Sequence, residues 1–242
     1  MSGLTEPWTG LCSFMFSWAS IFLQEGLAPA AEGIVIFHDH IMILLFGILA
    51  FVTYMFFYTG AYGGVDKNLL DAHALELIWT VVPIIILLFI AYPSLYLLYL
   101  TEEGGVSPVR VKVYGHQWYW EYESQTLEGG VFSFDSYISS NNSFRFRNLD
   151  VDNRLRIPAC TSSLLLVGSS DVLHSWTVPS LGVKVDAVPG RLNYISLAPT
   201  SYGVFYGQCR ELCGSNHRFI PITVEVISPT HFVSCLESLK AR

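Results

Sequence analysis

Two cysteines and a histidine lie in one short segment near the C-terminus, Cys209-Arg-Glu-Leu-Cys213-Gly-Ser-Asn-His217, and a second histidine, His174, lies upstream. Thiolates and imidazoles select copper, zinc or iron–sulfur clusters rather than magnesium or calcium. Structural zinc sites usually separate two cysteines by two residues, and a mononuclear blue-copper site uses one cysteine. The wider gap here favours a pair of copper ions bridged by both thiolates. Zinc, a Cys209–Cys213 disulfide and two inert thiols remain as alternatives.

This loop and the segment Asp171-Val-Leu-His174-Ser-Trp176 resemble the dinuclear copper A signature of mitochondrial-type cytochrome c oxidase subunit II. Residues 37–40, 75–80, 115–120 and 178–182 also agree with that family, in one order from about Gln24 to about Val226. The loop is also similar to the copper domain of nitrous oxide reductase, but the two apolar segments described below argue against that family. Two rivals remain: a quinol-oxidase-type subunit, which lacks the cysteine pair, and a structural subunit whose cysteines form a disulfide.

The resemblance implies an electron-transfer subunit of a terminal respiratory oxidase, which takes electrons from reduced cytochrome c through a copper A centre. It implies that the electrons pass to haem in subunit I, where the oxygen chemistry takes place, so that the chain is part of a proton-translocating oxidoreductase. The implied partners are subunit I, other complex IV subunits, cytochrome c and the lipid bilayer, with no nucleic acid. The implied location is the mitochondrial inner membrane.

The resemblance also implies the ligands, position by position. Two copper ions are expected on His174, Cys209, Cys213 and His217, with the backbone carbonyl of Glu211 as a further donor. The Glu211 carboxylate is expected to bind a magnesium ion shared with subunit I, and oxygen ligands suit that ion. Without the resemblance, Glu211 is equally consistent with a solvated loop acid.

One position departs from the family. The family's motif continues to a methionine that makes a weak axial contact to one copper, and Ile220 occupies that position. Axial ligands tune the potential of copper sites, so we expect the dinuclear site to survive with a shifted potential. Many animal mitochondria read the codon AUA as methionine, so translation with the standard table would also place isoleucine here. The mass of a peptide covering residues 219–226 separates the two explanations.

The segment Tyr114-Gly-His116-Gln-Trp118-Tyr-Trp120 is predicted to be one aromatic strand, with those four side chains on one face because side chains alternate. Core packing explains such a strand, and Trp120 is predicted to be structural. The resemblance implies instead that Trp118 is a surface indole through which electrons arrive from cytochrome c. Glu76 opens an apolar segment, where an acid stabilises a helix N-terminus by about 0.3–1 kcal/mol. The resemblance places Glu76 at the entrance of a proton path.

The composition indicates one membrane part and one soluble domain. The 242 residues are 52% hydrophobic and 14% charged, with a mean hydropathy of +0.43. Residues 41–65 and 77–101 carry no charge, and each exceeds the roughly 20 apolar residues that cross a bilayer. A short polar link joins them, which predicts an antiparallel hairpin. Its one lysine, Lys67, does not orient the hairpin, but the family places the link in the matrix and the soluble domain and both termini in the intermembrane space.

The sequence after Glu103 has the period of β-strands. Val109, Val111 and Val113 alternate with Arg110, Lys112 and Tyr114, and clusters of turn-forming residues follow at 128–130, 139–142, 168–171 and 188–190. Short strands at this spacing indicate a sandwich or barrel, with residues 220–226 as the last core strand. A ligand loop between two strands is the cupredoxin arrangement. The predicted fold class is therefore an all-β cupredoxin-like domain preceded by a two-helix transmembrane hairpin.

The expected division is an N-terminal segment 1–33, a transmembrane hairpin 34–101, a cupredoxin-like copper domain 102–230 and a C-terminal tail 231–242. The net charge of −7 comes mostly from residues 1–100, which hold seven acids and one base. A basic partner would therefore need a local acidic patch on the soluble domain, and Asp171 is either part of one or an ordinary loop acid.

Three smaller expectations complete the sequence analysis. Cys12, Cys160 and Cys235 are predicted to be packing residues. His38 and His40 are predicted to form a polar cap at the start of the first span, because a spacing of two points the rings to different faces of a helix. The first base in the chain is Lys67, so neither a basic signal-peptide flank nor an arginine-rich transit peptide is present. Their absence is consistent with synthesis inside the organelle.

Overall fold

A computed structural model describes residues 23–64, 67, 70–102, 107–125, 129–139 and 146–239. The chain forms two compact units. One unit combines residues 1–33 with residues 101–242, and the other is residues 34–100. The prediction for Cys12 and most of the predicted N-terminal segment lie outside the described residues.

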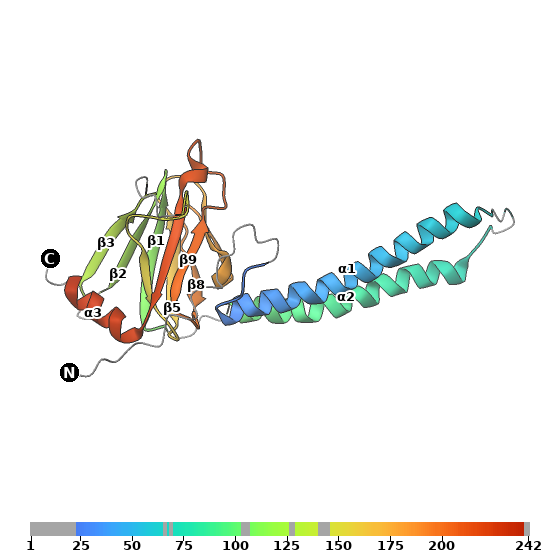
Figure 1. Ribbon diagram of the computed structural model, residues 1–242, viewed down its shortest axis with the longest axis horizontal. Helices are drawn as coiled ribbons and strands as arrows, with labels where there is room; N and C mark the ends of the chain where they lie inside the picture. The colour runs from blue at the N-terminus through green and yellow to red at the C-terminus, as the bar shows by residue number, and fades with distance from the viewer. Residues whose placement is uncertain are drawn as a thin grey trace. The chain divides into compact units, whose positions relative to one another are not determined.

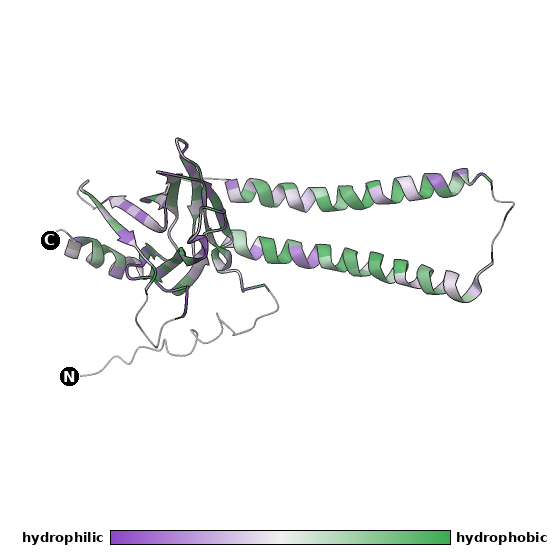
Figure 2. Ribbon diagram, turned by 90° about the horizontal axis from the view of Figure 1, so that it is seen from above, coloured by the Kyte–Doolittle hydropathy of each residue, from purple (hydrophilic) through white to green (hydrophobic). Residues whose placement is uncertain are grey.

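Two long helices make up the apolar part of the chain. α1 spans Pro29–Tyr62 and α2 spans His73–Glu102, and at 1.5 Å per residue both exceed the roughly 30 Å of a bilayer core. Their side chains are largely exposed and apolar on all sides (Figure 2), as expected of helices surrounded by lipid or by other helices. Both pass the test of length and composition for crossing a membrane. The predicted pair of spans is confirmed.

The remaining elements build the β domain. Among the described residues its strands are β1 Val109–His116, β2 Tyr119–Gln125, β3 Val131–Ser136, β4 Leu155–Pro158, β5 Ser163–Ser169, β6 His174–Val178, β7 Val183–Ala187, β8 Asn193–Leu197, β9 Gly203–Gln208 and β10 Pro221–Ile227. Short 3-10 turns, η1 Pro179–Leu181 and η2 His217–Phe219, and a final helix, α3 Pro229–Leu239, complete it. The strand orders are β3-β2-β1-β5-β8, β4-β10-β9 and β6-β7 (Figure 1).

The core follows from strand alternation. Along β1, Val111 and Val113 are buried while their neighbours are more exposed, as the period of two predicts. Trp120, Tyr122 and Trp176 are fully buried, and the Trp176 indole donates a hydrogen bond of 3.2 Å to the Tyr122 hydroxyl. Burial raises the pKa of Tyr122 far above its ordinary value. β10 is the last strand, one residue later than predicted.

The predicted single aromatic strand is wrong. Gln117 and Trp118 form a two-residue turn between β1 and β2, so Gly115 pairs with Trp120 and His116 with Tyr119. Paired residues share a face, which puts Trp120 in the core, while the His116 ring stacks on Tyr119 at 4.6 Å. Alternation along one strand could not foresee that the chain reverses at this point.

Several smaller predictions meet the structure differently. Cys160 is exposed, so it is not a packing residue, and Cys235 is only half-buried. His38 and His40 are exposed within α1, where His38 Nδ1 lies 3.2 Å from Asp39. The C-terminal residues 229–239 form a helix, α3, which buries Phe232 and Leu236.

Candidate metal centre

The close approach of two strands builds the site. His174 begins β6, and the segment 209–217 joins β9 to β10. A side chain at Gly207 in β9 would place its Cβ 1.9 Å from the Thr177 carbonyl oxygen in β6. Only glycine permits two backbones to approach so closely. Gly207 therefore lets β9 deliver Cys209 beside His174, although the two residues are far apart in sequence.

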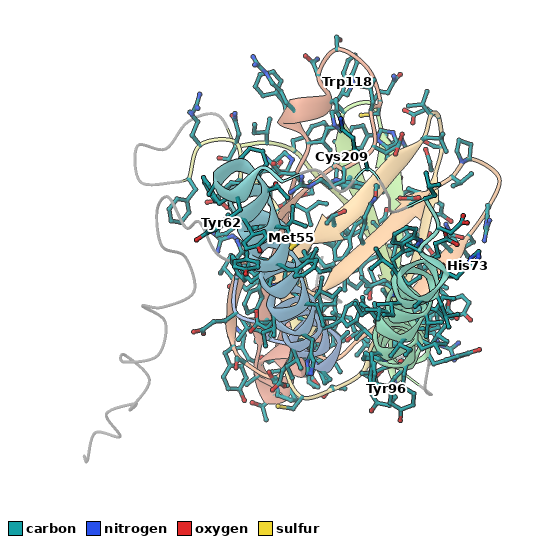
Figure 3. The ribbon with its side chains drawn as sticks, turned by 90° about the vertical axis from the view of Figure 1, so that its right-hand side faces the viewer. Met55, Tyr62, His73, Tyr96, Trp118 and Cys209 are labelled. Atoms are coloured by element: carbon teal, nitrogen blue, oxygen red, sulfur yellow. The ribbon has the colours of Figure 1, made fainter. Side chains whose placement is uncertain are left out.

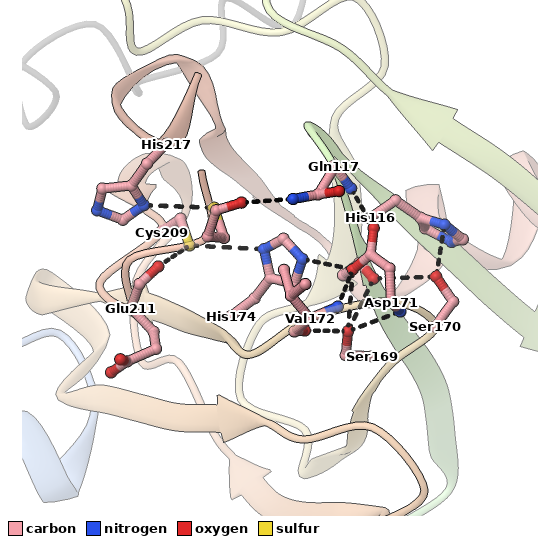
Figure 4. Close-up of polar contacts among 12 residues, drawn as sticks. His116, Gln117, Ser169, Ser170, Asp171, Val172, His174, Cys209, Glu211 and His217 are labelled. Atoms are coloured by element: carbon pink, nitrogen blue, oxygen red, sulfur yellow. Dashed lines mark hydrogen bonds and ion pairs between the residues drawn. The ribbon is translucent and has the colours of Figure 1, made fainter. Parts of the chain in front are cut away.

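The candidate ligands converge at this point. The ligand atoms of His174, Cys209 and Cys213 all lie within 4.8 Å of one another, and the three residues are buried. Cys209 Sγ lies 3.9 Å from His174 Nδ1, and Cys213 Sγ lies 3.5 Å from His217 Nδ1. Figure 4 shows the two imidazoles directed toward the sulfur atoms. Cys209 and Cys213 are free thiols, which does not support the disulfide alternative.

Glu211 takes part through its backbone. The Cys209 thiol donates a hydrogen bond of 3.3 Å to the Glu211 carbonyl oxygen, while the Glu211 carboxylate points away from the sulfur atoms (Figure 4). One residue thus presents a carbonyl to the thiols and a carboxylate to the opposite side. The copper and magnesium roles expected of Glu211 stay predictions.

A carboxylate holds the His174 ring. Asp171 Oδ1 lies 2.9 Å from His174 Nε2, and the Asp171 side chain also accepts hydrogen bonds of 2.6 Å from the backbone N–H groups of Val172 and Gln117. With the proton on Nε2, Nδ1 keeps its lone pair and faces the thiols. Carboxylate partners commonly fix metal-binding histidines in this way. Asp171 is therefore more than a solvated loop acid.

The pKa values of the two thiols shift in opposite directions. Burial would raise the pKa of Cys209, but hydrogen bonds with His174 and the backbone of Ser175 and Glu211 outweigh it and lower that pKa. Burial and the neighbouring Cys209 charge raise the pKa of Cys213 to about 12. Two adjacent thiolates repel each other in a buried site, and a metal ion between them removes that penalty.

The imidazole and its carboxylate partner shift in complementary directions. Burial would lower the pKa of His174, but hydrogen bonds with Cys209 and Asp171 raise it. Burial would raise the pKa of Asp171, but hydrogen bonds from His174, Val172 and Gln117 hold it below its ordinary value. The two groups therefore stabilise each other.

The donor set fits copper. Two thiols, two imidazoles and one carbonyl oxygen meet in one largely buried cluster, and soft and borderline ligands of this kind bind copper well. The hard oxygen ligands that magnesium and calcium require are scarce at the sulfur atoms. Ile220, at the family's methionine position, is 1% exposed, and its carbonyl accepts a hydrogen bond of 3.1 Å from the Cys209 N–H.

Trp118 lies against the metal loop. The indole is half-buried, and its Nε1 atom would be 3.3 Å from a Cβ at Gly214. Figure 3 shows Trp118 and Cys209 at the same end of the β domain. An open cavity of about 450 Å³ borders the indole and is lined by Gln117, Trp118, Tyr119, Tyr137, Ile138, Asn216 and Phe219. A partner docked there would touch an aromatic group next to the candidate ligands.

The remaining predicted site residue, Glu76, belongs to the helical unit of residues 34–100. Glu76 lies in the first turn of α2, where its carboxylate is 3.5 Å from His73 Nδ1, as expected of an acid at a helix N-terminus. Sequence reasoning missed Gly115, Gln117 and Gly207 as contributors to the site. Each acts through a contact with a residue distant in sequence, and the glycines were the available signal, because a glycine inside a strand often marks a close backbone approach.

A membrane-anchored β-sandwich with a cysteine–histidine cluster at one end defines the class of cupredoxin-like electron-transfer domains. Comparisons with known proteins identify the family within this class. A profile described as the periplasmic domain of cytochrome c oxidase subunit II matches residues 109–227, and the profile of its transmembrane domain matches residues 16–97. Cytochrome c oxidase subunit 2 of Drosophila simulans is 45% identical over 227 residues, covering 93% of this chain and 99% of the relative. The Aedes aegypti protein is 44% identical with the same coverage.

Solved structures agree with the fold. The periplasmic domain of subunit II of cytochrome oxidase from Bradyrhizobium japonicum is 38% identical, with a TM-score of 0.52 over 57% of this chain and 96% of that chain. A mixed disulfide intermediate between thioredoxin-like TlpAs and subunit II of cytochrome c oxidase is 36% identical, with a TM-score of 0.51 over 58% and 96%. The chain belongs to the cytochrome c oxidase subunit II family. It is thus a subunit of an oxidoreductase, and the two membrane-length helices support an inner-membrane protein.

Proposed function

We propose that this chain accepts electrons from reduced cytochrome c at a dinuclear copper centre and passes them to haem in subunit I of the same oxidase. The observation that carries the proposal is the buried convergence of His174, Cys209 and Cys213 within 4.8 Å, with His217 beside Cys213. When bound, the copper pair supplies one-electron redox chemistry. The protein would hold the copper ligands in place and keep water away from them.

The protein's part is to keep the donors fixed and dry. His174 is fully buried and held by Asp171, and the Cys209 backbone N–H donates a hydrogen bond to the Ile220 carbonyl. A site whose ligands are already in place rearranges little when its charge changes. Fast electron transfer at a small driving force requires that property.

Trp118 is the proposed point of electron uptake. It borders the open cavity at the metal end of the domain and touches the loop that carries both cysteines. A cytochrome c docked over this cavity would place its haem edge near the indole. Electrons would then cross from the indole to the loop through groups in direct contact.

The remaining parts of the proposal follow from the resemblance and the geometry. The Glu211 carboxylate, directed away from the thiols, would bind a magnesium ion shared with subunit I, and Glu76 would lie at the entrance of a proton path. The domains would divide as predicted, with the link between α1 and α2 in the mitochondrial matrix and the copper domain and both termini in the intermembrane space.

Metal analysis of the full chain tests the proposal. After copper loading under reducing conditions, we expect two copper ions per chain and a mixed-valence copper signal in electron paramagnetic resonance. The variant Cys209→Ser should lose this signal, and the matched control Cys160→Ser, which removes an exposed thiol, should keep it. A wild-type chain that holds zinc alone, or no metal, would contradict the proposal.

A further inference from the structure

The turn that carries Trp118 is tied to the candidate metal site by two hydrogen bonds from one residue. The Gln117 side-chain Nε2 donates a bond of 2.8 Å to the Cys213 carbonyl oxygen, and its backbone N–H donates a bond of 2.6 Å to Asp171. We propose that Gln117 is a positioning residue that fixes the Trp118 indole against the metal loop. This inference rests on the proposed function.

The first tie reaches the loop of the cysteines. Gln117 Nε2 donates to the carbonyl of Cys213 itself, a buried candidate ligand. A side chain at the adjacent Gly214 would crowd both residues, because its Cβ would lie 3.2 Å from Gln117 Nε2 and 3.3 Å from Trp118 Nε1. The amide and the indole therefore pack side by side on the same short piece of backbone.

The second tie reaches the candidate ligand on the other strand. The carboxylate that accepts from the Gln117 N–H also accepts from His174 Nε2. Through Asp171, the position of the turn is thus coupled to the orientation of the His174 ring. Gln117 thus bonds both to the Cys213 carbonyl and to Asp171, and Figure 4 shows Gln117 close to Asp171.

The two ties have a common consequence. Gln117 attaches the turn both to the cysteine loop and, through the Asp171 carboxylate, to β6, so the backbone that carries the indole cannot move away from the loop without breaking a hydrogen bond. The Trp118 N–H itself has no hydrogen-bond partner within the described part of the chain. Its neighbours, rather than a bond of its own, must therefore hold the indole in place.

The position of the indole matters because the rate of electron tunnelling falls steeply as the gaps between groups in the path widen. A copper pair on the candidate ligands would supply one-electron redox chemistry, taking its electron from reduced cytochrome c without proton transfer, and Gln117 would act only by setting the position of the indole. A displaced indole would lengthen the path between an electron donor docked over the cavity and the candidate ligands, and the tunnelling rate falls exponentially with the length of that path. Releasing the amide tie should therefore slow this step while leaving the ligands in place.

The variant Gln117→Leu in the assembled oxidase tests the inference. A leucine side chain has a similar size and no N–H group, while the backbone N–H that bonds to Asp171 is kept. Because Gln117 is exposed at the surface of the turn, we expect the variant to fold. We expect the rate of copper reduction at saturating cytochrome c to fall several-fold, because the indole is no longer fixed against the loop. We also expect copper content, copper spectrum and KM for cytochrome c to remain unchanged. Gln117→Glu, which sets a carboxylate against the Cys213 carbonyl, should slow the step at least as much.

The matched control is Gln125→Leu, at an exposed glutamine that ends β2, and it should behave as wild type. Two results would overturn the inference: an unchanged rate in both Gln117 variants, or a rise in KM alone, which would make Gln117 a docking residue. Loss of copper would overturn it too, since Gln117 would then support metal retention. Failure of the proposed function is a separate result, because the wild-type oxidase itself would not be reduced by cytochrome c.

Discussion

Gly115 lies against the His174 ring, so any side chain at this position should displace that ring and weaken metal binding by His174. An ideal Cβ at this position would lie 2.8 Å from His174 Cδ2, 2.9 Å from Cγ and 3.0 Å from Cβ. Non-bonded carbon atoms are best separated by about 3.5–4.0 Å. The substitution Gly115→Ala therefore requires a relative movement of about 0.7 Å, the difference between 3.5 and 2.8 Å.

The ring must make most of that movement. Gly115 lies in the central strand β1, paired with Trp120 on one side and Ser169 on the other, so the backbone is held from both sides. His174 is fully buried and meets the Trp120 ring edge-to-face at 5.8 Å. Its displacement would exceed the tolerance of about 0.2 Å on metal–ligand distances more than threefold. Crowding of this kind also costs about 1–3 kcal/mol of folding stability.

Copper affinity is the quantity to measure. Displacing a supported ligand typically weakens metal binding by about 10–100-fold, and competition of the full chain against a chelator of known affinity would detect this. Gly168→Ala is the matched control, because its Cβ in the neighbouring strand β5 would meet the Arg191 carbonyl at 3.3 Å and no atom of His174. If Gly115→Ala binds copper as tightly as wild type with an unchanged absorption spectrum, His174 is not held where the geometry requires and the reasoning fails.

Four further outcomes are expected. Trp118→Phe should retain full copper content but slow copper reduction by cytochrome c in stopped-flow experiments, and an unaltered rate would remove the indole from the path. Ile220→Met, a swap of similar volume in a buried position, should cost less than about 1.5 kcal/mol in chemical denaturation and shift the copper potential; an unshifted potential in redox titration would show that residue 220 does not reach the site. Tyr122→Phe leaves the buried Trp176 N–H without its acceptor and should destabilise the domain by about 1–3 kcal/mol, with stability equal to wild type as the contrary result. Association with cytochrome c should slow as salt rises, and salt-independent rates would argue against an acidic docking patch.

Local patterns in the sequence were sufficient for the architecture. Two uncharged segments longer than a bilayer requires predict membrane-length helices, and α1 contains residues 41–62 of the first segment while α2 contains the whole of the second. Alternation in Val109–Val113 predicted the inward face of β1. The prediction of one strand over residues 114–120 was wrong, because alternation of side chains does not show where the chain reverses direction. The prediction that Cys160 is a packing residue was wrong, because residue type alone does not determine burial.

The residue types and the spacing of Cys209, Cys213 and His217 determined the candidate chemistry, because ligands in one short loop meet the same ion whatever surrounds them. The family resemblance already named His174 as a ligand, but only the tertiary structure shows how it reaches the cysteines, because β9 approaches β6 at Gly207. It also decided that Asp171 orients the His174 ring and that Gln117 ties the Trp118 turn to the loop. These are contacts between distant segments, and their geometry arises from packing of the whole sandwich rather than from any local preference.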